Sequence, residues 1–179
     1  MHEAPLLDEP LREALRQAAA ALDAAERRGQ PFALSQALVQ MARGYRAMHA
    51  LASAETYLEL ALRWARATHS TDHTVDLLCE LCEAAEDVAQ AQDAQAPGSG
   101  HQARERARDH AFEASTLAGR VADPDWECTV LLRISDVLDR CGDRDDAVQL
   151  QARALRLLGG NADAADETMV PGLGRLADS

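Results

Sequence analysis

The chain has 179 residues, of which 47% are hydrophobic and only 3% aromatic, and its formal net charge is −12. This length suits one domain, and a core built from Ala and Leu suits closely packed helices better than a β-sandwich. The acidic excess opposes binding to a polyanion, so we expect no nucleic-acid partner. All 18 basic residues are Arg, which is typical of a GC-rich bacterial genome.

Three further features bear on where the protein acts. No apolar stretch is long enough to cross a membrane, so we expect no membrane association. The N-terminus lacks the basic start and the apolar core of a signal peptide. Without an export signal, the four cysteines indicate reduced thiols. Together these features predict a cytoplasmic protein.

Apolar residues recur every three to four positions over most of the chain, which predicts amphipathic helices. A Pro-Gly-Ser-Gly segment at 97–100 predicts a flexible interior loop, and Gly159-Gly160 predicts the end of the last strong helix. We therefore expect a flexible N-terminus (1–9), a helical domain (10–158) and an acidic Gly/Pro-containing tail (159–179) with one short helix at 162–169. In chain order, the predicted helices cover 10–29, 32–48, 53–67, 74–94, 103–121, 124–140 and 145–158.

Two stretches of the chain carry one residue template at the same offsets. A large–large–small–large set on one predicted helix is followed by small residues on the next helix, a pattern typical of helical hairpins that stack on copies of themselves. A third set between them fits less cleanly. The members are Leu38, Met41, Ala42, Tyr45, Ala54, Leu58 and Ala61; Leu78, Leu81, Cys82, Ala85, Ala107, Ala111 and Ala114; and Leu131, Ile134, Ser135, Leu138, Ala147 and Ala154.

This template resembles the tetratricopeptide repeat (TPR) over residues 32–158. The resemblance implies an all-α fold, a right-handed α-α superhelix of about three hairpins preceded by an N-terminal helix. The chain departs from the family at Gln151, where a large apolar residue is expected, and at the 97–100 segment, which replaces a tight turn. A compact four- or five-helix bundle is the rival fold, and it would bring the first and last helices into contact.

In the family the first helices of the hairpins line a concave groove, and residues off the core face point into it. The corresponding positions here would make the groove basic at one end, acidic in the middle and mixed at the far end. That implies a protein or peptide partner with Arg or Lys over the middle repeat, although charges of this kind also serve merely to solvate an exposed face. The candidate groove residues are Arg43, Arg46, Asp76, Glu80, Glu83, Asp87, Arg133, Asp136 and Arg140.

The sequence offers no convincing catalytic or metal site. It has no phosphate-binding loop, nucleophile elbow or Ser/His/Asp grouping, so we expect no enzyme activity and no cofactor. His69, His73, Cys79 and Cys82 have a two-plus-two composition that suits zinc. However, the two cysteines lie one turn apart within a predicted helix, with Cys82 at a core position, so we expect them to pack rather than bind metal.

The sequence thus predicts a non-catalytic adaptor that binds a protein or peptide through the groove of a TPR-like array. Two alternatives stay open. The first is a self-assembling structural scaffold, and the second is a secretion-chaperone-like binder of an unfolded export substrate. The chain itself is expected to be either a monomer or a homodimer.

Overall fold

The computed structural model of this protein describes residues 9–167, and the side chains of residues 9–159. Within this part of the chain the fold is all-α, with seven helices and no strand. None of the described helices combines the length and apolar character needed to cross a bilayer. The helices are α1 (Glu9–Arg28), α2 (Pro31–Ala47), α3 (Leu51–Ala67), α4 (Thr71–Gln95), α5 (His101–Ala118), α6 (Pro124–Cys141) and α7 (Arg144–Glu167).

Local sequence signals set several helix boundaries. Helix α6 begins after Asp123, whose side chain accepts a hydrogen bond from the backbone N–H of Trp126 at 3.0 Å, while Pro124 occupies the first turn. The same helix ends at Gly142, whose φ of 90° is in the left-handed region that favours glycine. In α4 the cap is Ser70, which accepts from the backbone N–H of His73.

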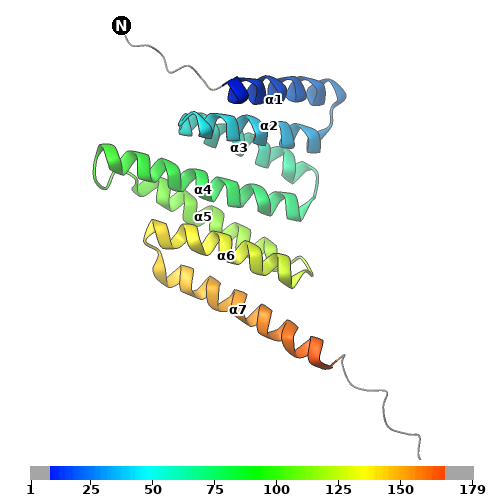
Figure 1. The fold of residues 1–179 in the computed structure, drawn as a ribbon, viewed down its shortest axis with the longest axis vertical. Coiled ribbons are helices and arrows are strands. Elements are labelled where there is room, and N and C mark those ends of the chain that lie inside the picture. The colour runs from blue at the N-terminus through cyan, green and yellow to red at the C-terminus, as the bar shows by residue number, and fades with distance from the viewer. Residues whose placement is uncertain (1–8, 168–179) are drawn as a thin grey trace, which may run out of the picture.

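Helices that follow one another in the chain pack together, and α4 also packs against α6. In Figure 1, α2, α4 and α6 lie in front of α3 and α5, while α1 and α7 lie at opposite ends of an elongated stack. A compact bundle, in which the first and last helices would touch, does not describe this arrangement. The stack instead leaves two end helices and one broad face formed by α2, α4 and α6.

The template positions form the core, as predicted. All of them are buried except Tyr45, which is half-buried and stacks on Tyr57 with ring centroids 5.1 Å apart. One hydrophobic cluster runs from Leu38 in α2 to Ala154 in α7. Because Ala and Ser occupy the facing positions, neighbouring helices can approach closely without cavities. The burial of the template confirms the predicted core residues in all three hairpins.

The junction between α4 and α5 is more ordered than a flexible loop. The Ser99 hydroxyl donates to the Gln92 carbonyl at 2.8 Å, and the Gly100 N–H donates to Asp93 Oδ1 at 2.8 Å. Glycine is required at position 100, since a Cβ there would lie 2.5 Å from the carbonyl oxygen of Ala89. The Pro-Gly-Ser-Gly segment therefore forms a hydrogen-bonded turn that lets α5 start close to the end of α4.

Helix α7 is longer than the sequence predicts. The double glycine at 159–160 does not end it, and the helix runs on to Glu167. A glycine inside a helix costs only about 1 kcal/mol relative to Ala, and the Ala-rich segment that follows favours helix. The short helix predicted at 162–169 is thus partly absorbed into α7, and its last two residues lie outside the described part of the chain.

Candidate functional site

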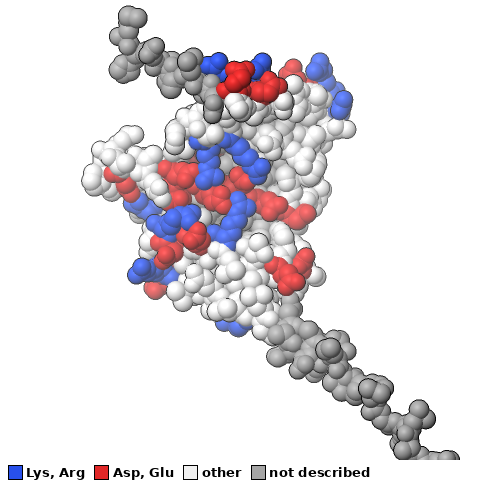
Figure 2. Space-filling view, viewed as in Figure 1, with Lys and Arg blue, Asp and Glu red and all other residues white. Residues whose placement is uncertain are grey.

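The predicted groove residues come together on the face formed by α2, α4 and α6, which we call the α2–α4–α6 face. In Figure 2, arginine and acidic side chains interleave across the middle of this face. Most of them neutralise one another. Arg43 of α2 donates to Glu80 of α4, with Nη2 and Oε1 2.6 Å apart.

Glu83 of α4 lies at the centre of the network. One carboxylate oxygen accepts from Arg133 of α6 at 2.5 Å, and the other accepts from Arg46 of α2 at 3.3 Å. Arg46 also donates to Asp87. Burial alone would raise the pKa of Glu83, but the hydrogen bonds and positive charges of the two arginines outweigh it and hold that pKa below its usual 4.5. One carboxylate thus joins the first helices of all three hairpins.

The far end of the network is also internally paired. Arg140 of α6 pairs with Asp136 on its own helix, and its Nε lies 3.4 Å from Oε2 of Glu86 on α4. Glu86 is only 4% exposed and also accepts from Gln90. These contacts explain why a charged residue is tolerated in that position. The acidic middle of the predicted groove is therefore occupied by the protein's own arginines.

Asp76 of α4 is the exception among the predicted groove residues. Within the described part of the chain it makes no hydrogen bond or ion pair, whereas the other eight each belong to an ion pair. Burial raises the pKa of Asp76, and the positive charge of Arg133 only partly opposes this effect. The Asp76 side chain is exposed, and within the described residues no arginine forms an ion pair with it, so its carboxylate is available to bind a cation.

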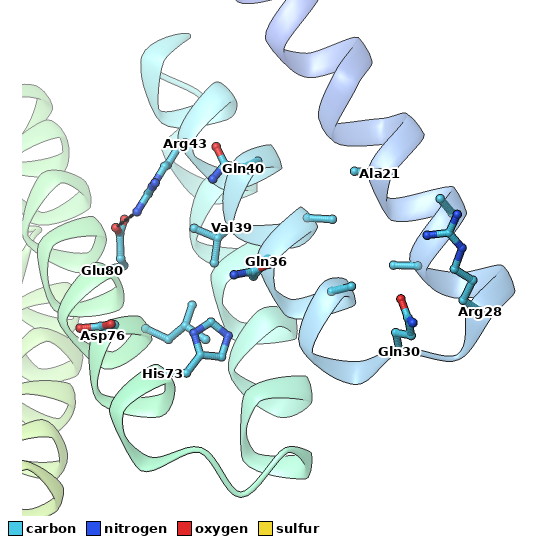
Figure 3. Close-up of a pocket in the computed structure, with 15 residues that line it drawn as sticks. Ala21, Arg28, Gln30, Gln36, Val39, Gln40, Arg43, His73, Asp76 and Glu80 are labelled. Carbon is cyan, nitrogen blue, oxygen red and sulfur yellow. Dashed lines mark hydrogen bonds and ion pairs between the residues drawn. The ribbon is translucent and has the colours of Figure 1, made fainter. Parts of the chain in front are cut away.

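Asp76 lines a pocket of about 620 Å³ between α1, α2 and α4. Figure 3 shows the residues that line it, with Arg43 and Glu80 pointing toward one another at one side. The lining also holds Arg28, His73 and Asp76, together with small apolar side chains and the amides of three glutamines, which can donate and accept hydrogen bonds. The lining residues are Ala21, Ala24, Ala25, Arg28, Gln30, Ala33, Gln36, Ala37, Val39, Gln40, Arg43, His73, Asp76, Leu77 and Glu80.

The sequence predicts α1 only as an N-terminal helix before the hairpins, and the contribution of α1 to this pocket was missed. The relevant signal is the set of six alanines between Ala18 and Ala25, because a helix with Ala on its inner face leaves space beside its neighbour. Gly44 of α2 has a related role, since a Cβ there would lie 2.4 Å from Leu15 Cδ2. Helices α1 and α2 approach closely at Leu15 and Gly44, whereas the alanines nearer the C-terminal end of α1 leave an open pocket between the two helices.

A hydrogen-bond chain fixes His73 in the pocket wall. The buried Ser35 hydroxyl donates to the carbonyl of Ala61 at 2.9 Å, so it accepts from His73 Nε2, also at 2.9 Å. The imidazole also contacts the ring of Phe32, with centroids 4.8 Å apart. This chain links α2, α3 and α4 directly beneath the position of Asp76 one turn along α4.

The histidine and cysteine residues that suit zinc by composition do not converge. Cys79 and Cys82 are buried at 1% and 0% exposure, and burial raises the pKa of Cys79 to about 12. Within the described residues, no group of three His, Cys, Asp or Glu side chains is placed to hold a metal ion. Both thiols belong to the main hydrophobic cluster.

Comparisons with known proteins show a similar fold but indicate no function. No protein-family model matches the chain, and no curated protein matches it. It is similar to the solved structure described as "DHF58 filament", with a TM-score of 0.53 and 22% identity over 88% of this chain and 84% of that chain. BtubC (BKLC) from P. vanneervenii matches with a TM-score of 0.37 and 19% identity, over 96% of this chain and 80% of that chain. At these identities only the filament chain is informative, and only about the helical fold.

Proposed function

We propose that this protein is a non-catalytic adaptor that binds a protein or peptide segment in the α1–α2–α4 pocket, with Asp76 receiving a Lys or Arg side chain of the partner. The observation that carries the proposal is the contrast between Asp76 and its neighbours. Every other acidic residue of the predicted groove is already paired with an arginine of this chain, and Asp76 is not.

Asp76 has no evident role in stabilising the fold. Because burial raises its pKa, the ionised carboxylate is less favourable in the folded chain than in water. Residues that lower the stability of the fold are common at binding sites, where they contribute instead to binding the ligand. The charge of a partner cation next to Asp76 would offset the unfavourable desolvation of this carboxylate.

The shape and chemistry of the pocket suit such a side chain. A volume of about 620 Å³ is typical of ligand pockets. The alanines of α1 and α2 can pack against the aliphatic stem of Lys or Arg. Gln36 and Gln40 can hydrogen-bond the backbone of an extended segment. We therefore expect the basic segment of the partner nearer the N-terminal end of the stack than the sequence predicts.

We further propose that the hairpins α2–α3, α4–α5 and α6–α7 are TPR-like repeats that form a right-handed superhelix. The recurrence of the buried template in all three hairpins supports this proposal, as does the placement of α2, α4 and α6 on one face. A secretion-chaperone-like role is the special case in which the bound segment belongs to an unfolded partner.

The test begins with selection of peptides from a random displayed library on the wild-type protein. Binding of the selected peptides is then compared with that of Asp76→Asn. Losing one charge-assisted hydrogen bond of about 1.5–3 kcal/mol predicts a weakening of about 10- to 100-fold. Asp109→Asn on α5 is the matched control, because it removes the same charge from an exposed site outside the pocket. Equal binding by wild type and Asp76→Asn would remove the proposal.

A further inference from the structure

Helix α7 carries an exposed apolar stripe at one end of the stack. Its core face is formed by Ala147, Leu150 and Ala154, as the helical periodicity requires. Val148 and Leu155, which are 60% and 67% exposed, lie on a side of the helix that faces away from the core, and Leu158, which is 47% exposed, lies between this side and the core face. Helix α7 is the last helix in the stack, and no other described helix covers this side (Figure 1). Three large apolar side chains so exposed along one helix are typical of an interaction surface.

We propose that this stripe binds the same stripe of a second copy of the chain, with the two α7 helices antiparallel. Val148 and Leu155 are seven residues apart, two helical turns, so they lie on the same side of the helix. In an antiparallel pair, Val148 of each copy faces Leu155 of the other, and the contact is closed by a two-fold axis. Both apolar side chains are then buried in one symmetric interface.

The charges that flank the stripe favour this orientation. Asp145 and Arg156 lie on one side of the stripe, at the two ends of its apolar segment, and neither forms an ion pair within the described residues. An antiparallel pair brings Asp145 of each copy near Arg156 of the other, which gives two attractive contacts. In a parallel pair the same flank of each copy falls on opposite edges of the interface, so these attractive contacts would not form.

The other end of the stack argues against open-ended assembly. The outer side of α1 carries Glu9, Glu13 and Arg16, which pair with one another and have side-chain exposures of 73%, 50% and 64%. An apolar α7 stripe that docked on this charged surface would bury ion pairs without new partners. The α7 stripe therefore fits a second α7 better than it fits α1, and this favours a closed dimer over a filament.

The test measures the mass of the full chain by sedimentation equilibrium over a range of concentrations. The wild type is expected to be a dimer of twice 19.3 kDa that dissociates on dilution. Leu155→Glu should raise the dissociation constant by at least about tenfold, because it places a charge in the centre of the interface. Leu60→Glu, at a 39% exposed leucine on α3, should leave the constant unchanged. Circular dichroism verifies that both variants remain helical.

A charge exchange tests the orientation of the helices. Asp145→Arg alone should weaken the dimer, and adding Arg156→Asp should restore it, because each pair of opposite charges is re-formed with reversed signs. A wild-type monomer at every concentration would overturn the proposal, whatever covers the stripe in the monomer. Assemblies that grow without limit would also overturn it, and so would a double variant that does not recover the dimer. Peptide binding through Asp76 is measured separately, so either proposal can fail alone.

Discussion

Arg133 of α6 and Glu83 of α4 are 50 residues apart in the sequence, yet Arg133 Nε lies 2.5 Å from Glu83 Oε1. Because Arg46 of α2 binds the other oxygen of the same carboxylate, Glu83 links α2, α4 and α6 through a single side chain. The pairing also means that the most acidic part of the face is not free to attract a basic partner. Both the stability of the stack and the proposed placement of a binding site at Asp76 rest on this arrangement.

The Glu83→Gln variant should destabilise the protein by about 1–3 kcal/mol, because two arginines lose a charged hydrogen-bond acceptor at a site where the Glu83 side chain is only 22% exposed. Urea unfolding at pH 7 measures the change. Glu113→Gln is the matched control, since Glu113 pairs with Arg66 at 40% exposure and such exposed pairs contribute about 1 kcal/mol or less. Equal losses in the two variants would show that the network has no special role.

The contribution of Glu83 should depend on pH in a defined direction. Since the folded chain lowers the pKa of Glu83, the stabilisation is complete above the usual value of 4.5 and is lost as the pH falls through the lower value of the folded state. The free-energy difference between wild type and Glu83→Gln should therefore be constant from pH 7 to about 5 and shrink below it. A difference that grows on acidification would contradict the lowered pKa.

The Asp76→Asn variant should behave in the opposite way and stabilise the protein at pH 7. Burial raises the pKa of Asp76, so the ionised form carries a folding penalty at neutral pH that disappears as the pH falls to the usual value of 3.8. Unfolding curves for wild type and Asp76→Asn should thus differ at pH 7 and coincide near pH 3. Loss of stability at pH 7 would mean that Asp76 has a structural partner, and the case for a free binding carboxylate would fail.

The Gly100→Ala variant should lower stability by about 1–3 kcal/mol, because the added Cβ would lie 2.5 Å from the backbone oxygen of Ala89 and α5 would have to shift. Gly159→Ala is the natural comparison. It lies within α7 with open space around the position of a Cβ, and Ala is favoured over Gly in a helix by up to about 1 kcal/mol. Thermal unfolding at one protein concentration should move in opposite directions for the two variants, and movement in the same direction would contradict the account of the turn.

Most of the fold could be predicted from the sequence because the spacing of large and small residues determines which helix face is buried. Leu38, Leu78 and Leu131 are equivalent in the template, and all are essentially inaccessible to solvent. The end of α7 was predicted wrongly, since a glycine pair makes a helix end more probable without enforcing it. Turn geometry at 97–100 was also missed, because it depends on hydrogen bonds between Asp93, Gln92 and the loop.

The grouping of charged residues on one face was predictable, whereas their pairing and the pocket beside Asp76 were not. Helical offsets correctly placed Arg46, Glu83 and Arg133 on one face. Which carboxylates these arginines reach depends on the distance between helices and on long flexible side chains, and neither is encoded in residue spacing. The pocket beside Asp76 depends on how α1 packs against α2, and this packing follows from tertiary contacts such as that of Leu15 with Gly44.

The most direct test of the binding proposal is a double-mutant cycle between Asp76 and a basic residue of a selected peptide. Affinity is measured for wild type and Asp76→Asn, each with the peptide and with its Lys→norleucine analogue, or with its Arg→norleucine analogue where Arg is the basic residue. If the two groups form an ion pair in the pocket, either change alone should cost about 1–3 kcal/mol, and the two together should cost little more than one. Losses that simply add, or selected peptides without any basic residue, would contradict the assignment of Asp76 as the carboxylate that binds the partner.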